Sequence, residues 1–318
     1  MALAWVWTET VAAAGAGAGA AAMGVVLATS DMGSQKLEGG GEAPNPEFYS
    51  PRADWPPKCL PLVNNGPVIS ESDTPVSPAT AMVLAAGRGM RMRPLTDTCP
   101  KPLLAVHGLP LMQWPMEALY RAGCQRLVVN TAWLGDQIEA RFASWSEEHP
   151  GGHIAYSHEG TDFGYALETA GGISRALPLL DDVFWVLAGD VYVPGFAFEP
   201  EALERFRASD HLAHLWLVPN PPHNLKGDFG LSPEGLALNQ AEERFTFSTI
   251  ALYRRALFEP PWCHTRPGNP QGSAEALAPL LRTAMDAGRV SAELYTGAWT
   301  DVGTPERLAE LNASAHSG

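Results

Sequence analysis

The sequence predicts an α/β fold, namely a Rossmann-like, mainly parallel sheet with helices on both faces and a small antiparallel subdomain. Short apolar runs alternate with stretches of helical spacing between residues 82 and 218. A strand that is followed by a helix and then by another strand favours right-handed crossovers and parallel pairing. From Lys226 onward, only turn residues separate the apolar runs, which indicates antiparallel strands.

The first strand is expected at residues 82–86, where five apolar residues precede Gly87. Further strands are expected at residues 126–130, 154–157, 183–187 and 212–218, with helices at residues 111–122, 137–145, 171–177 and 201–208. Ligands of such sheets bind at the carboxyl ends of the strands. Gly87, Asn130, Ser157 and Gly189 follow or end these strands, so we expect them at one edge of the sheet.

The second half of the domain is expected to contain the antiparallel strands. These are predicted at residues 229–231, 236–238 and 245–253, followed by a helix at 274–287, a strand at 290–295 and a helix at 305–311. We interpret the three antiparallel strands as a lid or subdomain that grips a ligand. There is no hexapeptide repeat, so no β-helical domain is expected.

The composition divides the chain into two parts. Residues 1–79 lack an amphipathic period, because residues 12–22 are all alanine or glycine and prolines recur through residues 44–78. Such a segment buries little apolar surface, so we expect a disordered low-complexity extension. Residues 80–318 are expected to form one folded domain.

The apolar residues 11–28 raise the alternative of a secretion signal or a membrane anchor. No lysine or arginine precedes Lys36, and Glu9 lies where a signal peptide carries positive charge. Alanine and glycine are also only weakly hydrophobic. We therefore expect a cytoplasmic protein without a membrane partner.

The charge and the cysteines exclude several functions. The net charge of −14 and the pI near 5.0 are unfavourable for binding nucleic acid, so anionic ligands should be small and bound by local positive charge. The cysteines are far apart and form no CxxC pair, which predicts reduced thiols without a disulfide or a zinc site. They are Cys59, Cys99, Cys124 and Cys263.

The loop after the first strand concentrates positive charge. Residues 82–104 carry a formal charge of +3, because four basic residues accompany Asp97 alone. Glycine amides with guanidinium and ammonium groups nearby are suited to a polyphosphate, so we predict a triphosphate cradle. The basic residues are Arg88, Arg91, Arg93 and Lys101.

Two other glycine loops do not fit the cradle. The dinucleotide pattern requires a third glycine where Met92 stands, and no Gly-Lys-Ser/Thr of an ATPase loop follows. An exposed turn without function is the remaining alternative. Pro94, Pro100 and Pro102 argue against it, because they rigidify a loop that would otherwise have no reason to be rigid.

The loop also carries a family likeness. Residues 87–96 read GRGMRMRPLT and residues 100–103 read PKPL. Together they resemble the signature of the sugar-1-phosphate nucleotidyltransferases. The likeness extends from about residue 81 to residue 311 and includes LET at 167–169, GDV at 189–191 and WTDVGT at 299–304.

The resemblance implies the nucleotidyltransferase fold, in which the antiparallel subdomain binds a sugar. It implies transfer of a uridylyl group from UTP to a sugar 1-phosphate, which gives a UDP-sugar and pyrophosphate. The expected acceptor is N-acetylmuramate α-1-phosphate, which belongs to peptidoglycan recycling. The alternatives are a mannose-1-phosphate guanylyltransferase and a catalytically silent sensor of sugar nucleotides. The oligomeric state is left open.

The resemblance also assigns the catalytic and metal residues. Arg91 corresponds to the arginine that contacts the β- and γ-phosphates, and Lys101 to the lysine at the α-phosphorus. Asp190 and Asp301 correspond to the carboxylates that hold Mg²⁺. Considered from the sequence alone, each aspartate could equally cap a helix.

The base is expected in the loop that follows residue 157. By resemblance, the uracil is read by Glu159, Thr169 and backbone groups of Ala85 and Ala86, beside the glycine loop that contains Gly87 and Gly89. The connection at 160–166 is longer than the family pattern, which puts Glu159 in doubt. Glu159 as a solvated acid is the open alternative.

Sugar hydroxyl and acetamido groups are read by carboxylates, amides and hydroxyls. The candidates are Glu168, Asn220, Asp228 and Thr249, and each could equally cap or turn the chain. No residue stands out for the lactyl carboxylate of muramic acid. His223 is placed either near the sugar or, as a lone loop histidine, simply in solvent.

Overall fold

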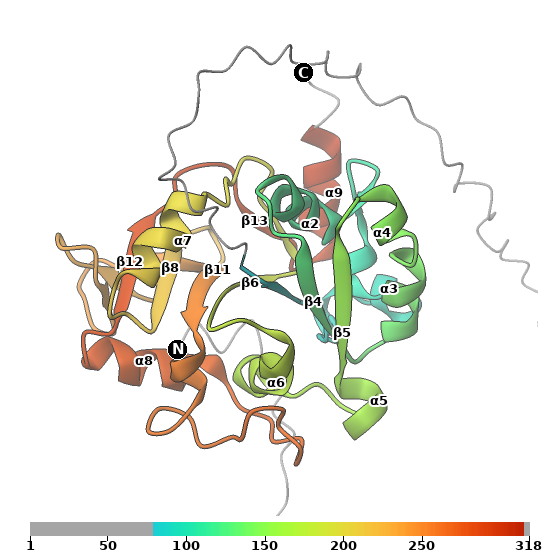
Figure 1. The fold of residues 1–318 in the computed structure, drawn as a ribbon. Coiled ribbons are helices and arrows are strands. Elements are labelled where there is room, and N and C mark those ends of the chain that lie inside the picture. The colour runs from blue at the N-terminus through green and yellow to red at the C-terminus, as the bar shows by residue number, and fades with distance from the viewer. Residues whose placement is uncertain (1–78, 315–318) are drawn as a thin grey trace, which may run out of the picture. The chain divides into compact units, whose positions relative to one another are not determined.

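A computed structural model describes residues 79–314 of the protein (Figure 1). The expected N-terminal extension lies outside the described residues except for Ala79, and Cys59 lies outside them too. Among residues 79–314, no helix combines the length and the hydropathy needed to cross a bilayer.

A seven-stranded sheet forms the centre of the fold. Its strands are, in spatial order, β12 (Val290–Leu294), β8 (Ala213–Val218), β11 (Thr246–Arg254), β6 (Val183–Ala188), β1 (Ala81–Leu84), β4 (Arg126–Thr131) and β5 (His153–His158). All strands run in one direction except β11, which is antiparallel to β6 and to β8. The prediction of a mainly parallel sheet is confirmed.

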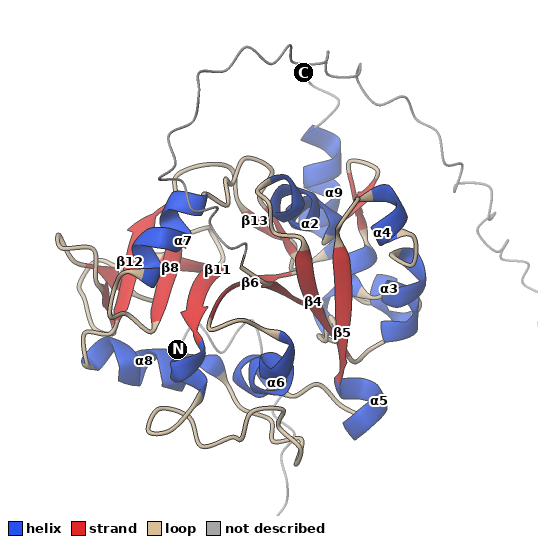
Figure 2. Ribbon diagram, in the orientation of Figure 1, coloured by secondary structure: helices blue, strands red, loops and turns tan. Residues whose placement is uncertain are grey.

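Helices cover both faces of this sheet (Figures 1 and 2). One layer contains α2 (Gln113–Arg121), α3 (Gly135–Arg141), α4 (Trp145–Glu148) and α7 (Pro200–Arg207), and the other contains α6 (Glu168–Ala176) and α8 (Leu277–Asp286). The side chains of β1 alternate between the layers. Ala81 and Val83 pack in the first and Met82 and Leu84 in the second, so every residue of β1 is buried.

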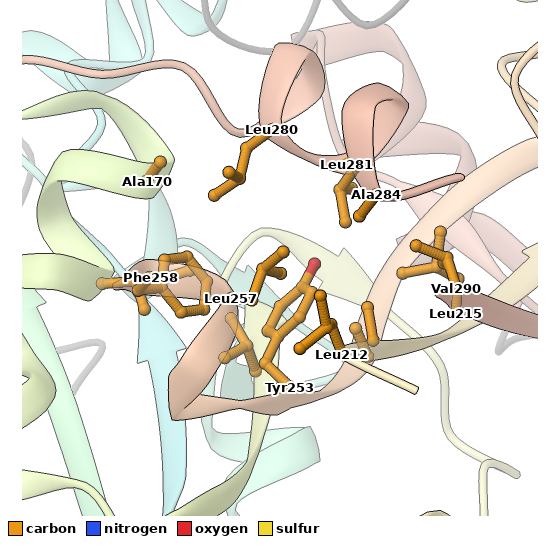
Figure 3. Packing of buried hydrophobic residues seen from close by; sticks show 14 of the residues in the cluster. Ala170, Leu212, Leu215, Tyr253, Leu257, Phe258, Leu280, Leu281, Ala284 and Val290 are labelled. Carbon is orange, nitrogen blue, oxygen red and sulfur yellow. The ribbon is translucent and has the colours of Figure 1, made fainter. Parts of the chain in front are cut away.

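The segment at residues 245–253 is placed differently from the prediction. It forms β11 between β6 and β8, and not part of a separate subdomain. Tyr253 is 1% exposed and lies among Leu257 and the α8 residues Leu281 and Ala284 (Figure 3). Apolar residues on both faces of this run have to be covered on both sides, and the centre of the sheet provides that cover.

Three two-stranded ribbons accompany the sheet. They are β7 (Val191–Tyr192) with β13 (Thr300–Asp301), β9 (Gly230–Leu231) with β10 (Ala237–Leu238), and β2 (Ala105–Val106) with β3 (Leu109–Pro110). A third, smaller core lies beneath the glycine loop. There Met92 packs with Val302 and with Leu308 of α9 (Pro305–Ser314), which ties the loop to the end of the domain.

The remaining elements are short. The predicted helix at residues 137–145 is divided into α3 and α4, and the long connection after β5 contains α5 (Glu159–Phe163). The glycine loop folds into three 3-10 turns, η2 (Met90–Met92), η3 (Leu95–Asp97) and η4 (Lys101–Leu103). Two more 3-10 turns, η5 (Leu177–Leu179) and η6 (Arg255–Phe258), follow α6 and β11.

Candidate active site

The carboxyl ends of the parallel strands meet at one edge of the sheet, as predicted. Leu84 of β1 lies in register with Asn130 of β4 on one side and with Ala188 of β6 on the other. Asn130 in turn pairs with Ser157 of β5. The glycine loop, Gly189 and the start of α5 therefore leave the sheet at the same edge.

The glycine loop is held open by a tight turn at Gly89. This residue has φ = 65°, and a Cβ on it would lie 3.1 Å from Thr96 and 3.2 Å from Lys101. Only glycine accepts both the backbone angle and the contact without strain. In the part of the chain that the structure describes, the amides of Gly87, Arg88 and Gly89 donate to no acceptor. Free amides of this kind suit a phosphate ligand.

The three arginines of the loop differ in their partners. Arg88 donates to Thr96 O (2.6 Å) and to Asp97 Oδ1 (2.9 Å), and it stacks 3.7 Å above the Trp133 ring. Arg93 pairs with the same carboxylate at 2.8 Å. Hydrogen bonds from Arg88, and then from Arg93, lower the pKa of Asp97. Arg91 is exposed and makes no hydrogen bond or ion pair within residues 79–314, so it is the arginine available to a ligand.

Lys101 lies at the bottom of the cradle, only 8% exposed. Its Nζ is 2.5 Å from Oδ2 of Asp190, the residue that follows β6 and Gly189. Burial strengthens this pairing, because an uncompensated ammonium in such a place is costly. The pair places a cation and a carboxylate where the α-phosphate is expected.

The β7–β13 ribbon brings Asp301 beside Asp190. Asp301 is the register partner of Val191, and the Val302 amide donates to the carbonyl of Asp190 (3.0 Å). The Asp301 carboxylate is not a helix cap. Its Oδ1 accepts from Arg307 (2.6 Å) and lies 2.9 Å from His223 Nε2.

The two aspartates fit a divalent cation. Oδ1 of Asp190 and Oδ2 of Asp301 have no partner among residues 79–314, while the other oxygen of each carboxylate is held by a cationic side chain. Carboxylate oxygens are the donors that hard cations prefer. Among residues 79–314, no group of three or more acidic, histidine or cysteine side chains is placed to hold a metal.

Glu159 is neither solvated nor exposed to a ligand, because it is 0% exposed. Its Oε1 accepts from Asn130 Nδ2 (2.7 Å) and its Oε2 from the Leu167 amide (2.6 Å). Asn130 Oδ1 accepts from the Ala85 amide (2.8 Å), which links β1 to the loop before α6. Burial raises the pKa of Glu159 to about 7, against the two hydrogen bonds and the charge of Arg175. The solvated alternative for Glu159 is therefore wrong.

Glu168 and Thr169 open α6. Thr169 is 6% exposed, whereas Glu168 is half-buried and has φ = 56°. A left-handed angle is unusual for a residue with a side chain and is commonest at functional sites. Among the described residues, the Glu168 carboxylate has no hydrogen-bond partner, so it is available to a ligand.

Asn220 and Asp228 organise the loop between β8 and β9. Asn220 donates to the Arg244 carbonyl (2.8 Å) and accepts from Thr246 Oγ1 (2.9 Å). Asp228 is 5% exposed and accepts from the Phe247 amide (2.9 Å). Burial raises the pKa of Asp228, and its Oδ1 has no partner in the described structure. Both side chains thus fix the loop from inside.

Thr249 lies at an irregularity of β11. Its φ is 68°, and the register of β11 against β8 shifts between Phe247 and Ala251. The neighbouring Ser248 carbonyl accepts from Trp299 Nε1 (3.1 Å), which ties this bulge to the Asp301 ribbon. Thr249 Oγ1 is buried without a partner among the described residues. A bulge beside an active site commonly aims a side chain at the ligand.

Three residues of the site were given no definite role from the sequence. Asn130 was placed at the edge without a role, His223 was placed either near the sugar or in solvent, and Arg307 was not considered. His223 is exposed, and its Nε2 lies 2.9 Å from Asp301 Oδ1. Partial desolvation, and then the charges of Arg307 and Arg91, lower the pKa of His223, although the Asp301 carboxylate raises it. Arg307, three residues after the WTDVGT segment, was the available signal.

Comparisons with known proteins agree with this geometry. A family model described as nucleotidyl transferase matches residues 80–235. The N-acetylmuramate alpha-1-phosphate uridylyltransferase of Neisseria meningitidis is 46% identical over 239 residues, which are 74% of this chain and 97% of that protein. The enzyme of the same name from Caulobacter vibrioides is 30% identical over 75% of this chain and 97% of its own length.

A solved structure shows the same fold. It is a provisionally named glucose-1-phosphate thymidylyltransferase of Bacillus anthracis, solved in complex with a sucrose. It aligns with a TM-score of 0.62 at 20% identity and covers 76% of this chain and 96% of its own.

Proposed function

The chain belongs to the sugar-1-phosphate nucleotidyltransferases, and from this premise we propose that it is a Mg²⁺-dependent uridylyltransferase. It would transfer a uridylyl group from UTP to N-acetylmuramate α-1-phosphate and release pyrophosphate. The identity to two relatives that carry this name supports the choice of nucleotide and sugar. A role in peptidoglycan recycling in the cytoplasm would follow from that substrate.

One observation carries the proposal. The glycine loop, the buried Lys101 and the two aspartates of the β7–β13 ribbon meet at one edge of the sheet. Two polyanions react here, so catalysis depends on neutralising and aligning charge. For that task the cluster has a buried lysine, together with amides and an arginine that have no partner among residues 79–314.

Each side chain has a distinct part in the transfer. An oxygen of the sugar phosphate attacks the α-phosphorus, and the bond from this phosphorus to the pyrophosphate oxygen breaks. Lys101 is placed to neutralise charge at the α-phosphate, and Arg91 to neutralise the departing pyrophosphate. No protein nucleophile or general base is required, because the attacking phosphate oxygen is already ionised at neutral pH.

Asp190 and Asp301 would hold the Mg²⁺, which supplies positive charge beside the phosphate oxygens when it is bound. Their free oxygens, Oδ1 of Asp190 and Oδ2 of Asp301, support this assignment. Lys101 and Arg307 would keep hold of the opposite oxygens and so orient both carboxylates. Ligand carboxylates are commonly oriented by such outer hydrogen bonds.

Uracil would be read by Thr169 and by backbone groups of Ala86 in the glycine loop. Glu159 would not contact the base, because it is buried. It would position the loop by accepting hydrogen bonds from the Asn130 side chain and the Leu167 amide. For the sugar, Glu168 is the candidate for direct contact, because its carboxylate has no partner among residues 79–314. Thr249 Oγ1 is buried, so Thr249 would shape the site from the bulge of β11. Asn220 and Asp228 would shape the loop around the sugar.

The test is pyrophosphate release with Mg²⁺, with UTP, GTP, CTP and dTTP each combined with several sugar 1-phosphates. The sugars are N-acetylmuramate, N-acetylglucosamine, glucose and mannose. We expect turnover with UTP and the muramate substrate. Turnover confined to GTP and mannose 1-phosphate would overturn the nucleotide and sugar assignments. Binding of UDP-sugars without any pyrophosphate release would identify a silent sensor.

A further inference from the structure

A pocket of about 370 Å³ is lined by Asp301 and Arg307, and the transfer described above uses no other residue of its lining. Pro221, Pro222 and Trp299 give it apolar walls, while His223, Arg307 and Glu310 supply the polar ones. Its position next to a proposed metal ligand places it where one end of the sugar phosphate is expected. The pocket is therefore within reach of a substituent on the sugar ring.

Arg307 uses only part of its guanidinium group. Its side-chain contacts go through Nη1, which lies 2.6 Å from Asp301 Oδ1, 2.9 Å from Asp301 O and 3.2 Å from His223 Nε2. Within residues 79–314, Nε and Nη2 donate to nothing. A Cβ on Gly303 would lie 3.1 Å from Nη2, so glycine at this position leaves that edge uncrowded.

We propose that the free Nε–Nη2 edge of Arg307 binds a carboxylate on the sugar 1-phosphate, and so selects a sugar that bears an acidic substituent. The inference rests on the proposed function and gives the lactyl group of N-acetylmuramate a binding residue. Guanidinium presents two parallel N–H donors that match the two oxygens of a carboxylate. A neutral sugar would leave this edge to water.

The charges around the free Nε–Nη2 edge of Arg307 are compatible with a bound anion. Asp301 is held through Nη1, on the other side of the guanidinium from the free edge. Glu310 lines the same pocket but is exposed to solvent, where its charge is screened. The side chain of Arg307 is only 19% exposed, so water weakens its hydrogen bonds less than at an open surface.

The experiment measures kcat/KM of the full chain with UTP and Mg²⁺ for N-acetylmuramate 1-phosphate and for N-acetylglucosamine 1-phosphate. These sugars differ only in the lactyl group. The ratio of the two kcat/KM values therefore reports how strongly the enzyme selects for the lactyl carboxylate. We expect the wild type to prefer the muramate substrate. Arg307→Met should lower the ratio about 10- to 100-fold, the loss expected for a hydrogen bond to a charged group. Arg307→Lys should retain part of the preference, because lysine keeps the positive charge but lacks the two parallel N–H donors.

Arg255→Met is the matched control. Arg255 donates to the carbonyls of Leu177 and Leu180 (2.6 and 2.8 Å) near the opposite end of the sheet, so its loss tests general destabilisation. We expect Arg255→Met to have the same ratio of kcat/KM values for the two sugar phosphates as the wild type. Thermal unfolding of each variant shows how much folded protein is present.

Two outcomes would overturn the inference alone. If Arg307→Met lowers kcat/KM equally for both sugars, the arginine only positions Asp301. If the wild type turns over both sugars equally well, nothing in the site reads the carboxylate, although uridylyl transfer stands. Turnover with GTP and mannose 1-phosphate only, which has no carboxylate, would overturn the proposed function and the inference together.

Discussion

Two residues of the proposed sugar site have left-handed backbone angles, namely Glu168 at φ = 56° and Thr249 at φ = 68°. Side chains other than glycine clash there with their own backbone, at a cost of roughly 1–2 kcal/mol for each residue. Strain of this kind persists only where the surroundings impose it. His107, Leu134 and Asn269 have such angles as well, so the angle alone does not identify a ligand contact. At Glu168 a second observation adds to it, because the carboxylate has no partner among the described residues.

Glycine at position 168 tests this explanation. Glu168→Gly and Glu168→Ala both remove the carboxylate, but only glycine relieves the strained angle. We expect the glycine variant to be more stable than the alanine variant by about 1 kcal/mol. Both should lose about 10- to 100-fold in kcat/KM for the sugar phosphate. Urea unfolding and steady-state kinetics measure the two effects, and full activity in either variant would show that the carboxylate is dispensable.

Glu159 should make stability depend on pH in an unusual direction. Its pKa is about 7 in the folded chain, against 4.5 as the ordinary value. Between these pH values the unfolded chain has released the proton while the folded chain still holds it. The free energy of unfolding should therefore fall as pH rises from 4.5 to 7, by at most about 3 kcal/mol.

Glu159→Gln removes this titration and serves as the comparison. The variant should be less stable at every pH, because glutamine offers one acceptor oxygen where the Asn130 side chain and the Leu167 amide need two. Urea unfolding from pH 4.5 to 7.5 gives, for each protein, the slope of unfolding free energy against pH. The difference between the two slopes is the contribution of Glu159. Equal slopes would mean that Glu159 titrates normally.

At the scale of elements, α6 approaches the end of β4 so closely that a side chain does not fit between them. A Cβ on Gly172 would lie 2.6 Å from Glu159 Oε1 and 3.0 Å from Asn130 Nδ2. Both groups are fixed by their hydrogen bonds to each other and to the backbone. The packing of this helix therefore sets the geometry of the loop proposed to read the base.

Gly172→Ala should disturb that loop despite the better helix propensity of alanine. We expect a loss of about 1–3 kcal/mol in unfolding free energy from overpacking. The KM for UTP should rise, while the ratio between sugar substrates stays the same. Gly195→Ala is the control, since the nearest heavy atom would lie 3.7 Å from its Cβ. Equal behaviour of the two variants would show that α6 can shift without consequence.

The limits of the sequence analysis also appear at the level of elements. The parallel strands were predictable because long apolar runs end in glycine or polar residues. The β7–β13 ribbon was not, because two-residue strands have no detectable period, although this ribbon brings Asp190 and Asp301 together. Arg307 meets Asp301, six residues earlier, only through the turn into α9, and this turn has no period that predicts the contact. The burial of Glu159 depends on Asn130, 29 residues earlier, and a contact over that separation leaves no local pattern.

At the scale of the whole molecule, positive charge is scarce and unevenly used. The chain carries a net charge of −14, yet its glycine loop carries +3. Asp97 engages Arg88 and Arg93, while Asp190 engages Lys101. Arg91 is left unpaired among the described residues, so it should meet the incoming triphosphate first.

The last prediction concerns the residues before Ala79. The described part contains a seven-stranded sheet with helices on both faces, and hydrophobic clusters fill both sides. A chain that begins at Ala79 therefore has a complete core and all of the proposed active-site residues. We expect it to match the full-length protein in kcat/KM and in melting temperature, measured side by side. A clear loss of either on deletion would mean that the first 78 residues contribute to the fold or to the site, because the core alone would then be insufficient.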